Sequence, residues 1–545
     1  MALTLFLLVP VVAAAWLLSA GRGSPVRVAR LVALAASALT LVIAVVVVTF
    51  RPEVDARWVP ALSLRWHLAV DGISVPLVLL TAALGLAVVL HAGGREPRTD
   101  SDTGDAGDTG GSRDPYPAAA GPNPPAATFY GCLLLTEFGA LATFLARDAV
   151  LFFVAFEVVL VPMWVLISRF GDPHASERDR ADASNRFVLF TALGSTLMLV
   201  GILILVTASG TSDLTELATA RGSGLDRGTQ LTVAVLLVVG LGIKVPLWPA
   251  HTWLPPAHTV APTAGSVLLA AVLLKMGTYG IVRLAIPTVP DGFASVAPFL
   301  AAAGAVGIIW GGLACLVERD LKRLVAYSSV AHMGFVAIGL ASGTQTGLQA
   351  ALFANIAHGL VSALLFFVVG TLKERWGSAD LTVARDALRD VSPRTGFALV
   401  VGFAAALGLP GLVGFWGEFI AVYAAWSPAG DRPTGLFRVC AVVGVVGMAL
   451  AAAYSLRVLR TVWAGHSGWT GAAAAGRSTD ARGAELAVLV TLVVLIIGAG
   501  VLPRPLLEVT APDSAALLGV RSTTVTATQA PGTTVEPGTT VGAGP

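Results

Sequence analysis

The sequence predicts an all-α polytopic membrane protein. Hydrophobic residues make up 55% of the 545 residues, charged residues make up only 12%, and the mean hydropathy is +0.80. The apolar residues gather in runs of about 17 to 25, the length that a helix needs to cross the hydrocarbon core of a bilayer. A soluble chain of this size could not bury so much apolar surface, so the composition excludes a soluble globular protein.

Fourteen such runs follow one another along the chain. They cover residues 2–20, 29–50, 73–91, 128–146, 149–168, 187–208, 230–250, 262–284, 295–317, 324–341, 349–372, 395–426, 438–461 and 484–503. The twelfth run, 395–426, is too long for one straight helix and contains Pro410 among several glycines, so we expect it to be broken. The seventh run carries two prolines shortly after Lys244 and should break there as well.

The two expected breaks stand five runs apart, which is an odd number. That spacing would place them in two units of opposite orientation, the arrangement of inverted repeats in many transporters. We therefore expect three helices, a disordered cytoplasmic loop, two five-helix repeats, a last helix and a disordered tail. The corresponding residues are 1–92, 93–127, 128–284, 295–461, 484–503 and 508–545.

The distribution of basic residues predicts the orientation of these helices. Counted together with the ends of the adjoining runs, loops after odd-numbered runs hold 22 lysines and arginines, against 11 in the other loops and the tail. Cytoplasmic loops are enriched in basic residues, so the odd loops are expected to be cytoplasmic. Both termini would then face outward from a bacterial-type cell membrane.

Lysine is scarce in this chain. Only 4 of the 35 basic residues are lysine, and two of them, Lys244 and Lys275, lie inside long apolar runs. Arginine does not release its proton in a protein, whereas a lysine amine taken out of water can do so. The choice of lysine at these two positions is the first indication of proton transfer within the bilayer.

Other ionisable side chains also fall inside the apolar runs. They are Glu137, Glu157, His332, His358 and Glu418. A charge at mid-bilayer costs about 2.5–3.5 kcal/mol on insertion scales, so such groups must face the bundle interior, a partner or water. A buried carboxylate–lysine pair or a single histidine can also serve only to join helices, and that alternative stays open. Charges at the edge of a run, such as Arg319, Asp320, Lys322 and Arg323, are expected to be interface anchors.

The sequence offers no motif for redox chemistry or for nucleic-acid binding. It has no phosphate-binding glycine loop and no haem or iron–sulfur motif, and the net charge is only +2. The three cysteines, Cys132, Cys315 and Cys440, are isolated and are expected to be packing residues. Any energy for proton movement would have to come from partner chains.

Four segments together carry a family resemblance. They are FEVVLVPMW, GIKVPLWPAHTWLPPAHTVAPTAGSVLLAAVLLKMGTYG, DLKRLVAYSSVAHMGF and GFWGEF. They resemble the antiporter-like subunits of respiratory complex I, the proton-pumping NADH–quinone oxidoreductase, over roughly residues 1–505 without the 93–127 insertion. Glutamate at Glu418, where related subunits usually carry lysine, is similar to the M-type subunit, and no long lateral helix of the L type follows the last run.

The resemblance implies a proton path near the middle of the membrane. Glu157 would be the charge partner that tunes Lys244, the central proton-holding amine. Lys275 would bridge toward the second repeat, and Glu418 would be the terminal group toward the outer face. The remaining members of the path would be Glu137, His332 and His358. The resemblance implies no cofactor in this chain, with flavin, iron–sulfur clusters and quinone in partner subunits, and it implies L- and N-type neighbours within the lipid bilayer.

Three other functions share these features. A subunit of a multisubunit sodium/proton antiporter has the same plan, and so does a membrane subunit of an energy-converting hydrogenase. A scaffold that only packs against partners belongs to a different class, and it predicts that neutral replacements of Lys244 or Glu157 leave turnover unchanged. Neighbouring genes would separate the first two alternatives from the complex I interpretation.

Overall fold

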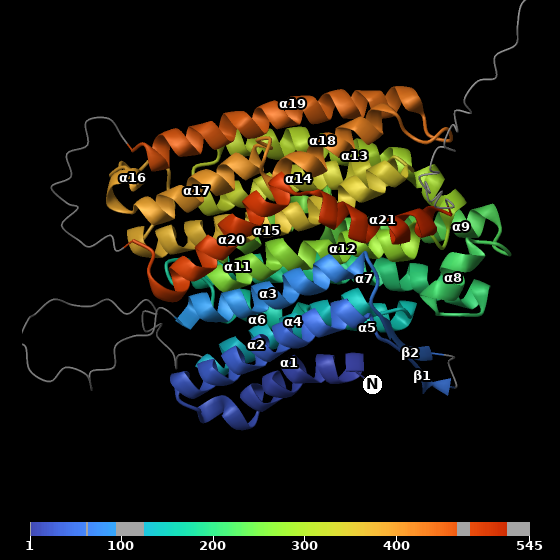
Figure 1. Cartoon of the computed structure of the whole chain (residues 1–545), viewed down its shortest axis with the longest axis horizontal. Helices are drawn as coiled ribbons and strands as arrows, with labels where there is room; N and C mark the ends of the chain where they lie inside the picture. The colour runs from blue at the N-terminus through green and yellow to red at the C-terminus, as the bar shows by residue number, and fades with distance from the viewer. Residues whose placement is uncertain (1, 61–63, 94–124, 466–479, 520–545) are drawn as a thin grey trace, which may run out of the picture.

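The computed structural model describes residues 2–60, 64–93, 125–465 and 480–519. Most of these residues are helical, and the helices lie side by side in one bundle (Figure 1). A small antiparallel hairpin, β1 (Glu53–Val59) with β2 (Leu64–Ala69), is the exception to the all-α prediction. This hairpin lies at the same end of the bundle as α8 and α21, which we name the hairpin end; the opposite end, which holds α16, is the α16 end (Figure 1).

The helices follow the predicted runs in order. In the first half they are α1 (Ala2–Leu18), α2 (Val26–Phe50), α3 (Ser74–Gly93), α4 (Ala126–Leu145), α5 (Ala149–Val158), α6 (Leu160–Arg169), α7 (Glu177–Ser209), α8 (Leu214–Ala220), α9 (Arg227–Lys244), α10 (Leu254–Val260), α11 (Thr263–Leu268) and α12 (Leu274–Gly280). In the second half they are α13 (Pro290–Val317), α14 (Leu321–Ala341), α15 (Gln345–Trp376), α16 (Leu388–Val391), α17 (Pro393–Ala406), α18 (Val413–Trp426), α19 (Thr434–Val458), α20 (Gly483–Val501) and α21 (Arg504–Leu518). Short 3-10 turns, η1 (Ala20–Gly23) and η4 (Ala250–Trp253), and π-helical turns, η5 (Leu269–Leu273), η6 (Ile281–Ala285) and η7 (Leu459–Trp463), extend or join them.

The membrane class and both helix breaks are confirmed. Among the described residues, 12 helical segments are long and apolar enough to cross a membrane, and α1 and α17 are shorter apolar helices. The helix α9 ends at Lys244, and a gap of six residues separates Ala406 of α17 from Val413 of α18. The total of fourteen spans and the inverted relation of the repeats stay predictions.

Two further irregularities were not predicted. The span at 149–169 divides at Val159 into α5 and α6, one residue beyond the end of the helix that carries Glu157. The span at 263–285 contains the π-helical turns η5 and η6, which flank Lys275. Extra residues of this kind inside a helix are frequent at functional sites.

The predicted disordered segments have different outcomes. Residues 94–124 lie outside the described residues, so the prediction of a disordered loop is not tested there. The prediction for 508–545 is wrong at its start, because α21 continues to Leu518. Tertiary contacts hold this helix, since Gln345 donates to the Ala511 carbonyl and Asp513 accepts from the Gly72 amide.

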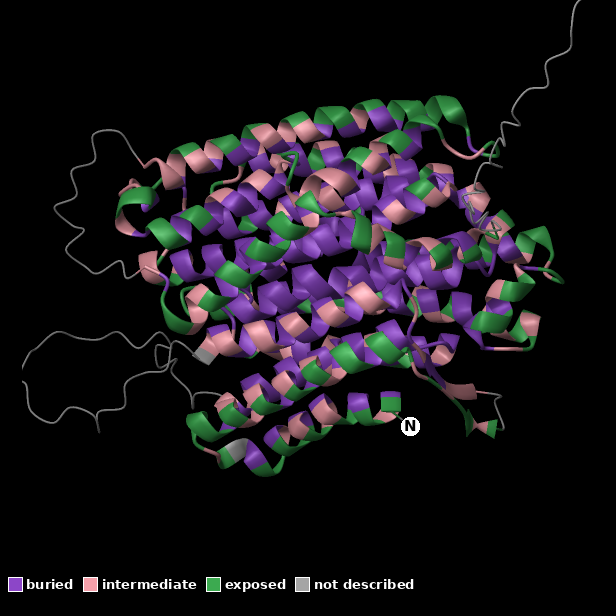
Figure 2. Ribbon diagram, viewed as in Figure 1, coloured by how far each residue is buried: buried purple, intermediate pink, exposed green. Residues whose placement is uncertain are grey.

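The core of the bundle contains the segment from α11 to η6 and the long helix α15. In the most apolar stretch of both, every residue is buried, whereas only about a third of the corresponding stretch is buried in α2 and α19. Figure 2 shows the same pattern, with buried residues in the centre and exposed residues along α1, α2 and α19. The two completely enclosed helices are therefore the ones that carry Lys275 and His358.

Candidate functional site

The first break places Lys244 at the end of α9. Pro246 lacks a backbone N–H and cannot continue the helix, so the chain leaves the helical path just after Lys244. The buried Lys244 ammonium lies 5.1 Å from the ring centre of Phe156 and 5.5 Å from that of Phe187, within the range of a cation–π interaction. Glu157 acts on Lys244 electrostatically, but among the described residues no ion pair within 4 Å joins them.

Lys275 lies on the neighbouring helix and is completely buried. Gly277 packs against Lys244, because a Cβ at Gly277 would come within 3.2 Å of the Lys244 Cβ. Lys275 Nζ donates to the carbonyl oxygen of Ala270 at 2.5 Å and lies 2.5 Å from His358 Nδ1. The two lysines therefore come from packed helices, and the second one is directly connected to the second half of the chain.

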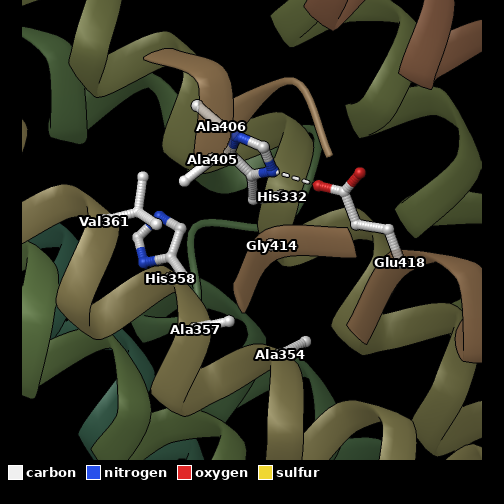
Figure 3. Close-up of a pocket in the computed structure, with 9 residues that line it drawn as sticks. All are labelled: His332, Ala354, Ala357, His358, Val361, Ala405, Ala406, Gly414 and Glu418. Atoms are coloured by element: carbon white, nitrogen blue, oxygen red, sulfur yellow. Dashed lines mark hydrogen bonds and ion pairs between the residues drawn. The ribbon is translucent and has the colours of Figure 1, made fainter. Parts of the chain in front are cut away.

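A row of hydrogen-bonding side chains continues from His358. The rings of His358 and His332 meet edge to face with their centres 5.8 Å apart, and His332 Nδ1 lies 2.6 Å from Glu418 Oε1. Figure 3 shows His332 turned toward Glu418 across the cavity, with His358 on the adjacent helix. The cavity has a volume of about 30 Å³, and its lining is His332, Ala354, Ala357, His358, Val361, Ala405, Ala406, Gly414 and Glu418. Most of this lining is apolar, with His332, His358 and Glu418 as its polar side chains, and the volume suffices for about one water molecule.

The second break lies directly beside Glu418. Gly408 and Gly411 have φ values of 75° and 92°, a backbone conformation that favours glycine, and Pro410 stands between them. A Cβ at Gly408 would lie 3.1 Å from Glu418 Oε2. The break thus brings backbone and carboxylate together at the end of the row.

Glu137 is not brought together with the other predicted residues. It accepts a hydrogen bond of 3.0 Å from Ser37 of α2, and a Cβ at Gly85 of α3 would lie 2.4 Å from its carboxylate. Gly139, two residues later, packs instead against Val159 near the end of α5. Glu137 therefore points from α4 toward α2 and α3, and its part in proton transfer stays a prediction.

The structure adds His258, which the sequence analysis did not select. It is completely buried at the end of α10, it stacks on Phe366 with ring centres 4.4 Å apart, and neither ring nitrogen has a hydrogen-bond partner among the described residues. Both Lys322 and Lys275 act on it electrostatically. The signal was present in the sequence, because His258 lies in the segment PAHTWLPPAHT that follows Lys244.

The prediction that Lys322 is an interface anchor is wrong. Its side chain is buried, and its amine donates to the carbonyl oxygen of Ala261. Asp320 caps the start of α14 by accepting from the Arg323 amide, so the helix turns Lys322 inward while Arg319 and Arg323 stay exposed. The position along the helix, rather than the distance from the edge of the run, decides which of these charges is buried.

An ion cluster fastens the hairpin end of the Lys275 helix. Asp71, in the turn just before α3, lies 2.5 Å from Arg283 and 2.8 Å from Arg147. Burial by itself would raise the pKa of Asp71, but the two guanidinium groups outweigh it and hold that pKa well below its usual value. This cluster joins α3, the α4–α5 turn and η6.

A histidine clasp holds the hairpin to the bundle. His67 Nδ1 lies 2.5 Å from Asp213, which caps α8, and His67 Nε2 lies 2.8 Å from Glu53 of the opposite strand. Burial lowers the pKa of His67, but the hydrogen bonds to both carboxylates outweigh burial and raise it above its ordinary value. Burial would raise the pKa of Asp213, and His67 brings it below its usual value.

The site therefore defines a class of protein: a membrane protein with buried amines, imidazoles and carboxylates beside two broken helices. The family model described as NADH:quinone oxidoreductase/Mrp antiporter, TM, matches residues 146–443. The matched region is more than half of the chain and contains both breaks and all of the row from Glu157 to Glu418. The chain belongs to this family.

Individual relatives agree with the family. The chain is 33% identical to NADH-quinone oxidoreductase subunit M of Rhodobacter capsulatus over 85% of this chain and 86% of that protein. It is 36% identical to NAD(P)H-quinone oxidoreductase chain 4 1 of Synechococcus sp. (strain JA-3-3Ab) over 75% of this chain and 71% of that protein. The fold is similar to a chain of respiratory complex I from Thermus thermophilus with bound NADH, with a TM-score of 0.78, 28% identity, and coverage of 95% and 100%.

Proposed function

We propose that this chain is the M-type, proton-translocating membrane subunit of an NADH–quinone oxidoreductase. The observation that carries the proposal is the row Lys275–His358–His332–Glu418, in which each member contacts the next. The four residues come from four helices, α12, α15, α14 and α18, and the last of these begins at the second break. Each side chain in this row can both take and give a proton, which is the property that transfer along a row requires. The similarity to subunit M of Rhodobacter capsulatus over 85% of the chain supports the assignment.

The contacts of the row support proton transfer along it. A proton held by Lys275 can pass to His358, because the two nitrogen atoms are 2.5 Å apart. His358 and His332 exchange it across their ring contact or through water in the cavity, and Glu418 receives it from His332 at 2.6 Å. The break beside Glu418 would then open toward the hairpin end, which the arginine bias predicts to face outward.

The Glu157–Lys244 pair would control proton movement along this row through its charge. The two side chains interact electrostatically without forming a direct ion pair, and the energy of this interaction depends on the distance between them. A small movement of Glu157 therefore changes how strongly the charge on Lys244 is stabilised. Val159, where α5 gives way to α6, supplies a hinge for such a movement. Moving one charge across a membrane potential of ~100 mV takes about 2.3 kcal/mol, which is less than the ~3–5 kcal/mol that breaking a buried ion pair costs.

The energy for pumping would come from partner subunits. The proposal assigns flavin, iron–sulfur clusters and quinone to those partners and none of them to this chain. The neighbours in the membrane would be the other subunits of the complex, including the L- and N-type antiporter-like subunits. The chain would lie in a bacterial-type cell membrane with both termini on the outer face.

The experiment that tests the proposal replaces Lys244 by alanine in the intact complex. NADH–quinone turnover and proton pumping are measured in inverted membrane vesicles, with assembly checked from the size of the complex, and the exposed Arg186→Ala serves as the matched control. We expect both activities to collapse in the assembled Lys244→Ala complex and to persist in the control. Unchanged NADH oxidation with lost sodium resistance would instead support the sodium/proton antiporter, which the description of the matched family also covers.

A further inference from the structure

The end of α10 at the α16 end of the bundle is held by two lysines. Lys322 Nζ donates to the carbonyl oxygen of Ala261, and Lys373 Nζ donates to that of Thr259 at 3.2 Å. Lys373 also forms an ion pair of 2.5 Å with Asp172. The terminal carbonyls of a helix lack partners within the helix, so cations at this point satisfy them.

This cluster reaches from solvent into the interior. The side chains of Lys373 and Asp172 are 14% and 12% exposed, whereas Lys322 is 3% exposed. Burial alone would raise the pKa of Asp172, but the ammonium group of Lys373 holds it below its usual value. Asp172, Glu374 and Asp320 all act on Lys322 electrostatically, as does the like charge of Lys373.

Elsewhere the chain uses arginine to hold the ends of helices. Arg457 donates to the carbonyl oxygens of Cys315 and Glu318 at the end of α13, and Arg432 Nε donates to that of Ala341 at the end of α14 at 3.0 Å. With 31 arginines and only 4 lysines in the chain, two lysines at the end of α10 stand apart from this usage. A cap needs only a positive charge, whereas lysine can also lose its proton.

The two lysines also continue the row of the proposed path. His258 lies three residues before Ala261, and both Lys322 and Lys275 act on it electrostatically. His258 in turn acts on His358, which contacts Lys275. His258, whose ring nitrogens have no hydrogen-bond partner among the described residues, therefore lies within electrostatic range of both the lysine cluster and the centre of the row.

We propose that Lys373 and Lys322 form the entrance through which protons reach His258 and Lys275 from the α16 end, which the arginine bias predicts to be cytoplasmic. This inference rests on the proposed proton-translocating function. Lys322 gives its proton to His258, and the neutral amine regains one from Lys373, which exchanges protons with water. Asp172 positions Lys373 at the mouth and stabilises its charged form.

The first experiment exchanges lysine for arginine, which keeps the charge and the cap but not the proton exchange. Lys322→Arg and Lys373→Arg are made in the intact complex, and proton pumping and NADH–quinone turnover are measured across a range of pH. We expect the complex to assemble and proton pumping to fall about 100-fold, which is the scale of losing a positioned proton carrier. The pH dependence of pumping should also shift. The matched control is Arg457→Lys, which exchanges the same two residue types at another helix end and should pump normally.

The outcomes separate this inference from the proposed function. Normal pumping with an unchanged pH profile in both arginine variants, while Lys275→Met is inactive, would leave the row intact and overturn the entrance. Normal pumping in Lys275→Met as well would overturn both. A displaced pH profile would not follow from capping alone, because arginine provides the same charge.

A second measurement covers the case in which an arginine variant fails to assemble. Thr259→Cys places a small thiol one residue from His258, and the native cysteines Cys132, Cys315 and Cys440 are all buried. A membrane-impermeant maleimide applied to the cytoplasmic face should label this position and stop pumping, whereas labelling of the exposed control Thr382→Cys should not. Full pumping after complete labelling at residue 259, or labelling only from the outer face, would refute an entrance at this point.

Discussion

Replacement of Lys275 by methionine tests the centre of the row. The Lys275 side chain is fully buried, and its amine contacts the Ala270 carbonyl oxygen and His358 Nδ1, each at 2.5 Å. Methionine has a similar length and volume, so it fills the same space without a large cavity. The substitution removes the exchangeable proton and keeps the packing of α12 against its neighbours.

The stability change can be worked out from these contacts. Loss of the ammonium group removes an insertion cost of about 2.5–3.5 kcal/mol. The Ala270 carbonyl and His358 each lose a partner, which costs about 1–3 kcal/mol per group. The two effects largely cancel, and the net change is between about −1.5 and +3.5 kcal/mol, so the complex should still assemble.

The assay compares NADH-driven proton uptake, NADH–quinone turnover and complex size in the same inverted vesicles. We expect an assembled complex of normal size in which pumping is reduced at least about 100-fold, the scale of losing a positioned acid–base group. Lys275→Arg should fail in the same way, because arginine holds a charge and does not release its proton. A Lys275→Met complex that pumps at the wild-type rate would refute the reasoning.

Two predictions concern the hairpin end. The pKa of His67 is raised in the folded protein, so its clasp with Asp213 is strongest below about pH 6.5, the pKa of an unfolded histidine, and weakens as pH rises through the folded pKa. The thermal stability of the detergent-solubilised complex should therefore fall with rising pH. The variant His67→Gln should lose this pH dependence. Retention of the same slope in His67→Gln would contradict this assignment. Asp71→Asn leaves Arg147 and Arg283 without their carboxylate and should lower the unfolding free energy by about 3 kcal/mol. The measurement is the melting temperature of the complex, which should fall. An unchanged melting temperature would contradict this role of Asp71 and show that the two arginines find other partners.

The sequence by itself determined the membrane class, the approximate spans and both breaks. Run length and composition decide whether a helix can cross a bilayer, and those quantities are local. Proline at 246 and 410 and the glycines beside 410 act through their own backbone geometry, so the breaks could be predicted without knowledge of neighbouring helices. Ionisable residues in apolar runs were found in the same way, because their cost does not depend on a particular partner.

Local irregularities were beyond the sequence pattern. The division of the fifth span at Val159, the π-helical turns beside Lys275 and the helix α21 were not predicted. The helix α21 is held by hydrogen bonds to distant residues, from Gln345 and from the Gly72 amide. The hairpin is held by the clasp between His67 and Asp213, which are 146 residues apart. Neither helical periodicity nor turn composition contains that information.

Only the tertiary structure decided which titratable groups meet. Lys275 contacts His358 across 83 residues and His332 contacts Glu418 across 86, and the sequence holds no record of such distances. Glu137 has the same kind of surroundings in the sequence as Glu157, yet the rotation of α4 turns it to Ser37 and away from the row. The physical reason is that a sequence fixes the face of a helix on which a side chain lies, while the packing of helices fixes what that face touches.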